Sequence, residues 1–353
     1  MTREAMARLD RELAFQTSAR YDLLAATHVA HAEMGAPDLE EQLGRAIAKA
    51  EGVIAVIGRI GAGKSSLISA VTSALNEGFV PLRISVVGVE AGDPAAFARH
   101  AMLEIRDLPE TRLAEHERRA LARDTALART SERRTELRAG FEIAAGEVFT
   151  PKILANLQKI AAETLTHGVD AAEILAGLQR LLDAFWRLGR CPVLIVDDTD
   201  HWGGEPAAAE AFFDTTARAL GRLDAVTVVQ AQTAYTELAG YRRVRETFTA
   251  ELHLPALPDP RAALVAILQR RIDGAGVQAR VSDLFEPGGL DLLRDAYLAT
   301  AADGRAGDVR HALVVARTAL ELAVEDELAE RVGTGQVQEA LARNPLGPGS
   351  ALG

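Results

Sequence analysis

One short stretch constrains the fold of this chain more than any other part of its sequence. It reads Gly58-Arg59-Ile60-Gly61-Ala62-Gly63-Lys64-Ser65 and is followed by Ser66. The stretch matches the pattern G-x-x-x-x-G-K-[ST] at every fixed position. An apolar run of buried-strand type, 53–57, precedes it, and apolar residues at helical spacing follow it. Such a strand–loop–helix turn aims backbone N–H groups inward and adds the dipole of a helix N-terminus, so it predicts a cradle for phosphate groups.

The polar residues of this motif predict what the cradle binds. Lys64 would neutralise charge on the β- and γ-phosphates of a nucleoside triphosphate, and the hydroxyl of Ser65 would ligate Mg²⁺. Every residue from Gly58 to Ser66 is therefore a candidate nucleotide-binding residue. We expect ATP and Mg²⁺ as the ligands.

A second apolar run, 192–196, ends in a pair of acids. Asp197 would hold Mg²⁺ through water, and Asp198 stands where a carboxylate polarises the attacking water. A further apolar run, 225–229, leads to Gln232 and Thr233. Either side chain could reach the γ-phosphate and position water, the alternative being an ordinary exit from strand to loop.

Composition excludes several classes of protein. No apolar stretch approaches the roughly 18 residues of a membrane span, and charges alternate at the N-terminus where a signal peptide needs an apolar core. We therefore expect a cytoplasmic protein with no membrane association. The single cysteine, Cys191, allows no internal disulfide. The formal net charge of −11 argues against a protein that coats nucleic acid, although a local basic patch could still contact DNA.

Periodicity and the glycine-rich motif predict an α/β fold of the P-loop NTPase type, with a parallel five-stranded sheet, a helical insertion and helices from 258 onward. The two remaining strands are expected at 81–89 and 251–255. The predicted domains are a partly exposed N-terminal helical segment at 1–37, an ATPase core at 38–257 with the insertion at about 94–190, a helical lid at 258–343 and a flexible tail at 344–353.

These motifs, in this order, resemble those of the AAA+ ATPases, and among them the replication-initiator branch. The resemblance covers roughly 38–90 and 190–343, and it implies that the core has three layers and that the helices from 258 onward form an all-α C-terminal lid. It implies that Gln232 or Thr233 occupies the sensor-1 position and that Arg310 in Gly307-Asp308-Val309-Arg310 acts as sensor 2 on the γ-phosphate. It also implies an arginine finger, for which Arg243 and Arg245 are the candidates. ATP would then lie between core and lid, where water held by Asp198 and sensor 1 attacks it in line, while Lys64 and Arg310 stabilise the charge that develops.

Two departures from the initiators shape the expected function. Too few residues follow the lid for a winged-helix DNA-binding domain, and the insertion of about 94–190 is more like those of STAND-type, mobile-element and anti-phage ATPases. We therefore expect an ATP-hydrolysing switch or assembly ATPase that acts on a protein partner or a homo-oligomer. The alternative is a DNA-binding loader or remodelling ATPase. A small-molecule kinase is disfavoured, since no acceptor-site pattern is present.

Overall fold

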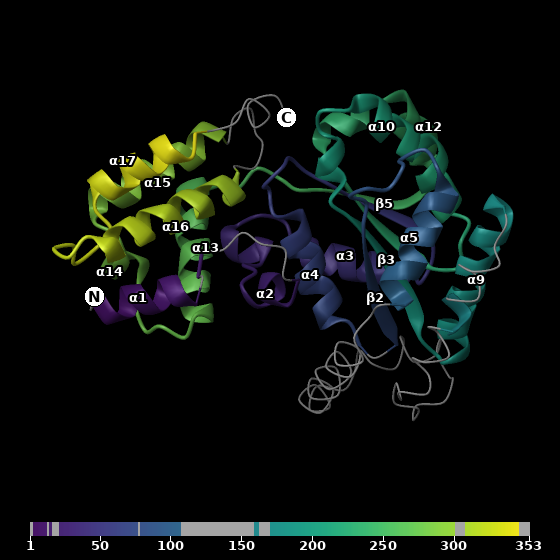
Figure 1. Ribbon diagram of the computed structural model, residues 1–353, viewed down its shortest axis with the longest axis horizontal. Helices are drawn as coiled ribbons and strands as arrows, with labels where there is room; N and C mark the ends of the chain where they lie inside the picture. Colours follow the sequence, from purple (N-terminus) through teal and green to yellow (C-terminus); the bar gives the residue numbers. More distant parts are fainter. Residues whose placement is uncertain are drawn as a thin grey trace. The chain divides into compact units, whose positions relative to one another are not determined.

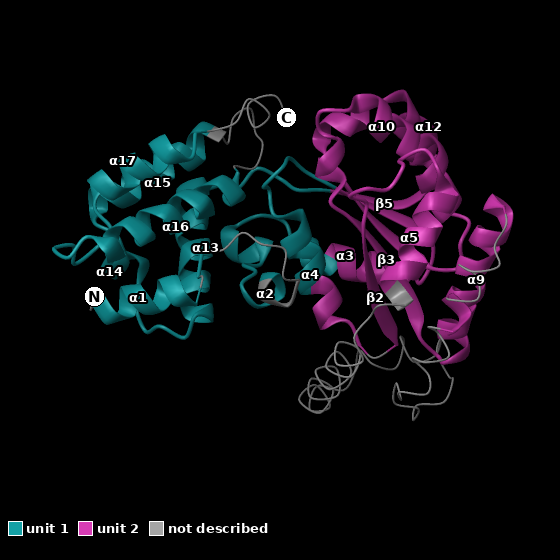
Figure 2. Cartoon of the chain, in the orientation of Figure 1, with its two compact units in different colours: residues 1–41, 57–70, 253–353 teal, residues 42–56, 71–252 magenta. Residues whose placement is uncertain are grey.

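The computed structural model describes residues 3–12, 14–15, 21–76, 78–106, 159–161, 170–300 and 308–345. Most of the predicted insertion, 107–158 and 162–169, and most of the predicted tail, 346–353, lie outside these residues. The chain divides into two compact units (Figure 2). Unit 1 combines 1–41, 57–70 and 253–353, and unit 2 combines 42–56 and 71–252.

The centre of the fold is a five-stranded parallel sheet with the order β2-β3-β4-β1-β5 (Figure 1). Its strands are β1 (Val53–Ile57), β2 (Phe79–Ser85), β3 (Cys191–Asp197), β4 (Val226–Ala231) and β5 (Phe248–His253). The register of β2 on β3 places Ser85 opposite Asp197. Every residue of β1, β3 and β4 is buried, as expected for strands of a parallel sheet that is covered on both faces. The predicted fold class is confirmed.

The helices of unit 2 surround this sheet. They are α5 (Pro94–Arg106), α9 (Ala171–Arg187), α10 (Pro206–Ala211), α11 (Arg218–Leu220) and α12 (Ala239–Val244), with a π-helical turn at Phe212–Ala217 between α10 and α11. In α9 the Asp170 side chain accepts a hydrogen bond from the backbone N of Glu173, which caps the helix. Its apolar residues recur at helical spacing and are buried, because α9 packs against β3 and α5.

The described part of unit 1 consists mainly of helices, and it also contains the last residues of β1 and β5 and the glycine-rich loop. Its N-terminal helices are α1 (Arg3–Arg11), α2 (Tyr21–Ala26), the short turn η1 (His31–Met34) and the start of α3 (Leu39–Ala48), and the first part of α4 (Lys64–Ala74) also belongs to it. Its C-terminal helices are α13 (Pro260–Gly274), α14 (Val281–Leu284), α15 (Pro287–Thr300), α16 (Val309–Glu325) and α17 (Thr334–Arg343).

The N-terminal helix belongs to the apolar core of the C-terminal helices. Met6 and Leu9 of α1 are fully buried, and so is Phe15, in one cluster with residues such as Leu313 and Leu320 of α16. The helix is partly exposed, as expected, because Arg3, Glu4 and Arg8 are exposed while its apolar face is buried. The period of an amphipathic helix shows that one face is apolar, but not which partner covers it. Within the described residues, no helix is long and apolar enough to cross a membrane.

Candidate functional site

The glycine-rich loop runs from the end of β1 at Ile57 to the start of α4 at Lys64. Gly61 and Gly63 adopt φ values of +75° and +98°, which favour glycine because it lacks a Cβ. Lys64 is only 4% exposed, and its Nζ donates hydrogen bonds to the carbonyl oxygens of Gly58 at 2.8 Å and Arg59 at 2.9 Å. The loop thus curls around its own ammonium group, and the predicted strand–loop–helix context is present.

Within unit 1, the N-terminus of α16 contacts this loop. The backbone N of Val309 donates to the carbonyl oxygen of Gly61 at 3.1 Å. Asp308 caps α16 by accepting a hydrogen bond from the backbone N of His311 at 2.9 Å. The Asp308 carboxylate lies so close to Gly61 that a Cβ there would be 1.9 Å from Oδ1. Arg310, the predicted sensor 2, is exposed in the first turn of α16. The helix that carries Arg310 is thus hydrogen-bonded to the loop through the backbone N of Val309.

In unit 2, the first of the two acids at the end of β3 is surrounded by donors. The side chain of Asp197 is 2% exposed. Its Oδ2 accepts from Nε of Arg83 at 2.6 Å, and its Oδ1 accepts from the side-chain amide of Gln230 and, at 2.7 Å, from the backbone N of Asp198. Burial raises the pKa of Asp197, and the charge of Arg83 offsets only part of that shift. Hydrogen bonds from Arg83, Gln230 and the backbone N of Asp198 hold the carboxylate of Asp197 in place.

The second acid lies in a different environment. Asp198 has the left-handed backbone conformation, with φ of +61°, which aspartate tolerates better than most residues. Its Oδ2 accepts a hydrogen bond from Oγ of Ser85 at 2.7 Å, and its Oδ1 lies 3.9 Å from Arg83. Because its side chain is 39% exposed, Asp198 keeps access to water, which Asp197 does not. The two acids thus differ in burial and in hydrogen-bond partners.

Three partners of these acids were missed by the sequence analysis: Arg83, Ser85 and Gln230. A signal existed in β2, because Arg83 and Ser85 are polar, two residues apart and therefore on one face of a largely apolar strand. For sensor 1, the sequence favoured Gln232 and Thr233, which follow β4. The side-chain contact to Asp197 comes from Gln230, two positions earlier and inside the strand.

The candidate arginine fingers are both exposed and both paired with acids of unit 2. Arg243 lies 2.9 Å from Asp214 and 3.6 Å from Glu210, and Arg245 lies 2.7 Å from Glu251. Exposed pairs of this kind stabilise a protein little, so a competing phosphate could break them at small cost.

Each unit by itself carries side chains that suit the ligands expected from the sequence. In unit 1 the hydroxyl of Ser65, and in unit 2 the carboxylates of Asp197 and Asp198, offer hard oxygen atoms, which Mg²⁺ prefers. Lys64 and Arg310 offer the positive charge that a triphosphate needs. Lys64 and Arg310 lie in unit 1 and the acids in unit 2.

Several solved structures are similar to this chain. Three of them are the Aeropyrum pernix ORC1 protein in complex with DNA (TM-score 0.48, 19% identity, covering 86% of this chain), the Aeropyrum pernix ORC2 protein as ADPNP–ADP complexes (0.49, 18%, 87%), and Cdc6p from Pyrobaculum aerophilum (0.48, 13%, 87%). The matches cover 64%, 67% and 68% of those chains, respectively. No protein-family model and no curated protein matches the sequence.

Proposed function

We propose that this chain binds and hydrolyses ATP and works as an AAA+-type molecular switch. The observation that carries the proposal is the glycine-rich loop itself. It joins a buried strand to a helix, it has glycines with positive φ at 61 and 63, and it holds a nearly buried lysine at its end. That combination is the architecture of a triphosphate cradle.

The roles of the side chains follow from their chemistry. Lys64 binds the β- and γ-phosphates, Ser65 and Asp197 hold Mg²⁺, and Asp198 polarises the attacking water. Mg²⁺ supplies charge neutralisation on the transferring phosphate. Arg310 contributes further positive charge from α16. Because α16 is hydrogen-bonded to the loop at Gly61, a change in the loop on nucleotide exchange would be transmitted to the C-terminal helices, and this movement is the proposed output of the switch.

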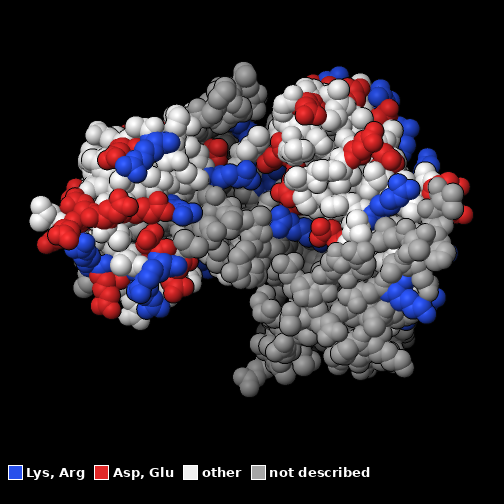
Figure 3. All heavy atoms as spheres, viewed as in Figure 1, with Lys and Arg blue, Asp and Glu red and all other residues white. Residues whose placement is uncertain are grey.

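The partner of the switch is proposed to be another protein or a second copy of this chain. The net charge of −11 supports this choice over DNA. Figure 3 also shows acidic and basic side chains interspersed over the described part of the visible face. A DNA-binding loader or remodelling ATPase is the alternative.

The test of the proposal is nucleotide binding and turnover by the whole chain. We expect the wild type to bind a fluorescent ATP analogue in the presence of Mg²⁺ and to release phosphate. Lys64→Ala should weaken binding by about 10- to 100-fold, the value of one to two charge-assisted hydrogen bonds. The matched control is Lys49→Ala, an exposed lysine at the end of α3. Equal binding by both variants would refute the site.

The same assay separates the two kinds of partner. Hydrolysis that is unchanged by double-stranded DNA supports the protein-directed switch. Hydrolysis that rises with DNA supports the loader.

A further inference from the structure

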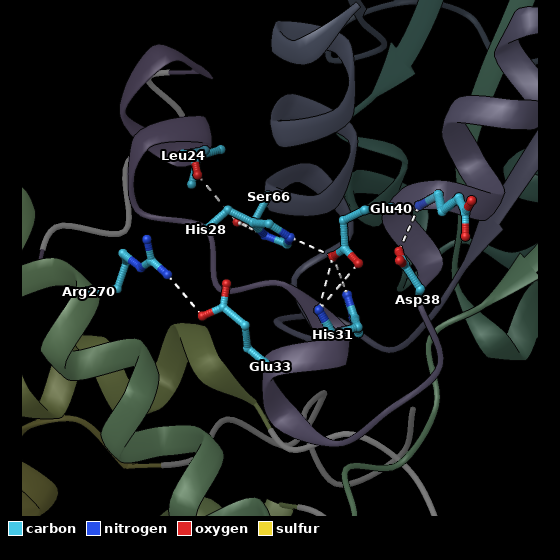
Figure 4. Close-up of polar contacts among 9 residues, drawn as sticks. Leu24, His28, His31, Glu33, Asp38, Glu40, Ser66 and Arg270 are labelled. Atoms are coloured by element: carbon cyan, nitrogen blue, oxygen red, sulfur yellow. Dashed lines mark hydrogen bonds and ion pairs between the residues drawn. The ribbon is translucent and has the colours of Figure 1, made fainter. Parts of the chain in front are cut away.

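A cluster of metal-ligating side chains lies beside the glycine-rich loop, within unit 1. His28 follows α2, His31 begins η1, and Glu40 lies in the first turn of α3 (Figure 4). Nothing in the proposed ATPase chemistry uses these residues. They are close in sequence but lie in three successive segments: the loop after α2, the turn η1 and the helix α3.

The three ligand atoms converge on one point. Oε1 of Glu40 lies 2.7 Å from Nε2 of His28 and 2.7 Å from Nδ1 of His31. One ligand atom from each residue lies within 4.8 Å of the other two. The imidazoles are 10% and 7% exposed and the carboxylate is 20% exposed, so the cluster is largely shielded from water. Two imidazoles and one carboxylate form a ligand set that suits divalent first-row transition metals.

The residues around the cluster hold its members in orientation. Nδ1 of His28, the nitrogen that faces away from Glu40, lies 3.0 Å from Oγ of Ser66. The backbone N of His31 donates to both carboxylate oxygens of Glu40, at 3.1 and 3.3 Å. Metal-ligating histidines usually have their second nitrogen fixed by such a hydrogen bond, which sets the tautomer and the ring plane.

The competing interpretation is a hydrogen-bonded cluster that only ties the N-terminal segment to α4. Both imidazoles lie within hydrogen-bond distance of the same atom, Oε1 of Glu40, rather than of separate acceptors. A cluster that only links two segments does not require two rings on one oxygen. Ligands about 2.0–2.2 Å from a tetrahedral ion lie a little over 3 Å apart, so small shifts of these atoms would admit one.

We infer that His28, His31 and Glu40 bind one divalent transition-metal ion, of which Zn²⁺ is the representative. The three side chains leave a fourth position for water or another ligand. The ion would fix the segment from His28 to Glu40 against Ser66 at the start of α4. The ligand set differs from that of the proposed Mg²⁺ position, whose ligands are hard oxygen atoms only.

The test uses the full chain, freed of metal by chelator and dialysis. Zn²⁺ is titrated by calorimetry in the presence of millimolar Mg²⁺, and Co²⁺ is titrated by visible absorption, which reports tetrahedral coordination. We expect one ion per chain and a rise in melting temperature on Zn²⁺ addition. His28→Ala and His31→Ala should each weaken Zn²⁺ binding by at least about tenfold.

Two further variants keep the result interpretable. Glu40→Gln retains the size of the side chain and its hydrogen-bonding oxygen but removes the charge, so it should weaken Zn²⁺ binding even where the alanine variants fold poorly. His253→Ala removes an exposed histidine outside the cluster and should leave Zn²⁺ binding unchanged. No Zn²⁺ binding by the wild type, or equal binding by the wild type and Glu40→Gln, would overturn the inference. Because no nucleotide is present, the outcome is independent of the proposed ATPase function.

Discussion

The guanidinium of Arg83 is paired with the carboxylate of Asp197, with Nε 2.6 Å from Oδ2. Arg83 lies on β2 and Asp197 ends β3, so the pair links neighbouring strands. Asp197 is also the acid that we assign to Mg²⁺. A permanent cation within the strands therefore compensates the negative charge of Asp197, and the ion pair and the metal would share one carboxylate.

Removal of Arg83 should destabilise unit 2. Arg83→Met removes the charged partner of the buried Asp197, and we expect a loss of about 2–3 kcal/mol in the free energy of unfolding. Urea denaturation followed by circular dichroism measures it. The control, Arg222→Met, changes an exposed arginine and should stay within about 0.5 kcal/mol of wild type. Adding Asp197→Asn to Arg83→Met should restore part of the loss, and strict additivity would contradict the pairing.

Asp198→Asn should separate ATP binding from hydrolysis. The amide keeps the shape of the side chain but cannot polarise water as a carboxylate does, so turnover should fall by roughly 10²- to 10⁴-fold while ATP remains bound. Phosphate release and a binding titration on the same preparation measure the two effects. Asp224→Asn, at an exposed acid, is the control. An equal loss of binding and turnover would instead assign Asp198 to metal coordination.

Gly61→Ala should disturb the loop from which ATP binding is proposed. The new Cβ would lie 1.9 Å from Oδ1 of Asp308, and the φ of +75° adds strain of about 1–2 kcal/mol. We expect a lower melting temperature and weaker binding of the ATP analogue. Gly204→Ala, where a Cβ meets nothing within 4 Å, should be neutral in both measurements. Normal binding by Gly61→Ala would show that α16 does not constrain the loop.

The single thiol should report the unfolding of the sheet. Cys191 is fully buried in β3, and burial raises its pKa to about 12. At about pH 8 the native thiol should therefore resist alkylation and react only after denaturation. The unfolded thiol ionises near its ordinary pKa of 9.0, so the stability that the buried thiol contributes is complete below that pH and is lost as the pH rises toward 12. Rapid labelling of the native protein would contradict this burial.

A mixing experiment tests the arginine fingers. If Arg243 or Arg245 reaches the phosphate of a neighbouring copy, specific activity should rise with protein concentration. An equimolar mixture of Arg245→Ala and Lys64→Ala chains, each inactive alone, should then regain activity, because one mixed interface combines an intact loop with an intact arginine. Arg242→Ala, at an exposed arginine paired with Glu237, is the control. Full activity of the Arg243→Ala and Arg245→Ala chains at all concentrations would rule both out.

Local pattern was sufficient to predict the sheet. Five apolar runs predicted five strands, and the strand β1 has the bounds expected from the sequence. The beginning of β5 was predicted less well, because the strand begins at Phe248 rather than near residue 251. Its first residues are only partly buried, so no apolar run marks them.

Contacts between distant residues could not be predicted in this way. Arg83 and Asp197 are 114 positions apart, and His28 and Ser66 are 38 apart. Periodicity shows which face of an element a residue occupies, but a partner is chosen only when the elements pack. The glycine-rich loop could be predicted from the sequence because the residues that form it are consecutive.

The burial of Met6 and Leu9 against α16 has a consequence for how the protein is made. Ribosomes release the chain from its N-terminus, so α1 emerges long before the helix that covers it has been synthesised. Until then α16, against which α1 packs, is absent, and chaperones or transient non-native contacts would shield the apolar face of α1. All residues of unit 2 leave the ribosome before α16 does, so the sheet can form first. Translation rate and chaperone supply should therefore affect the yield of the C-terminal helices more than that of the sheet.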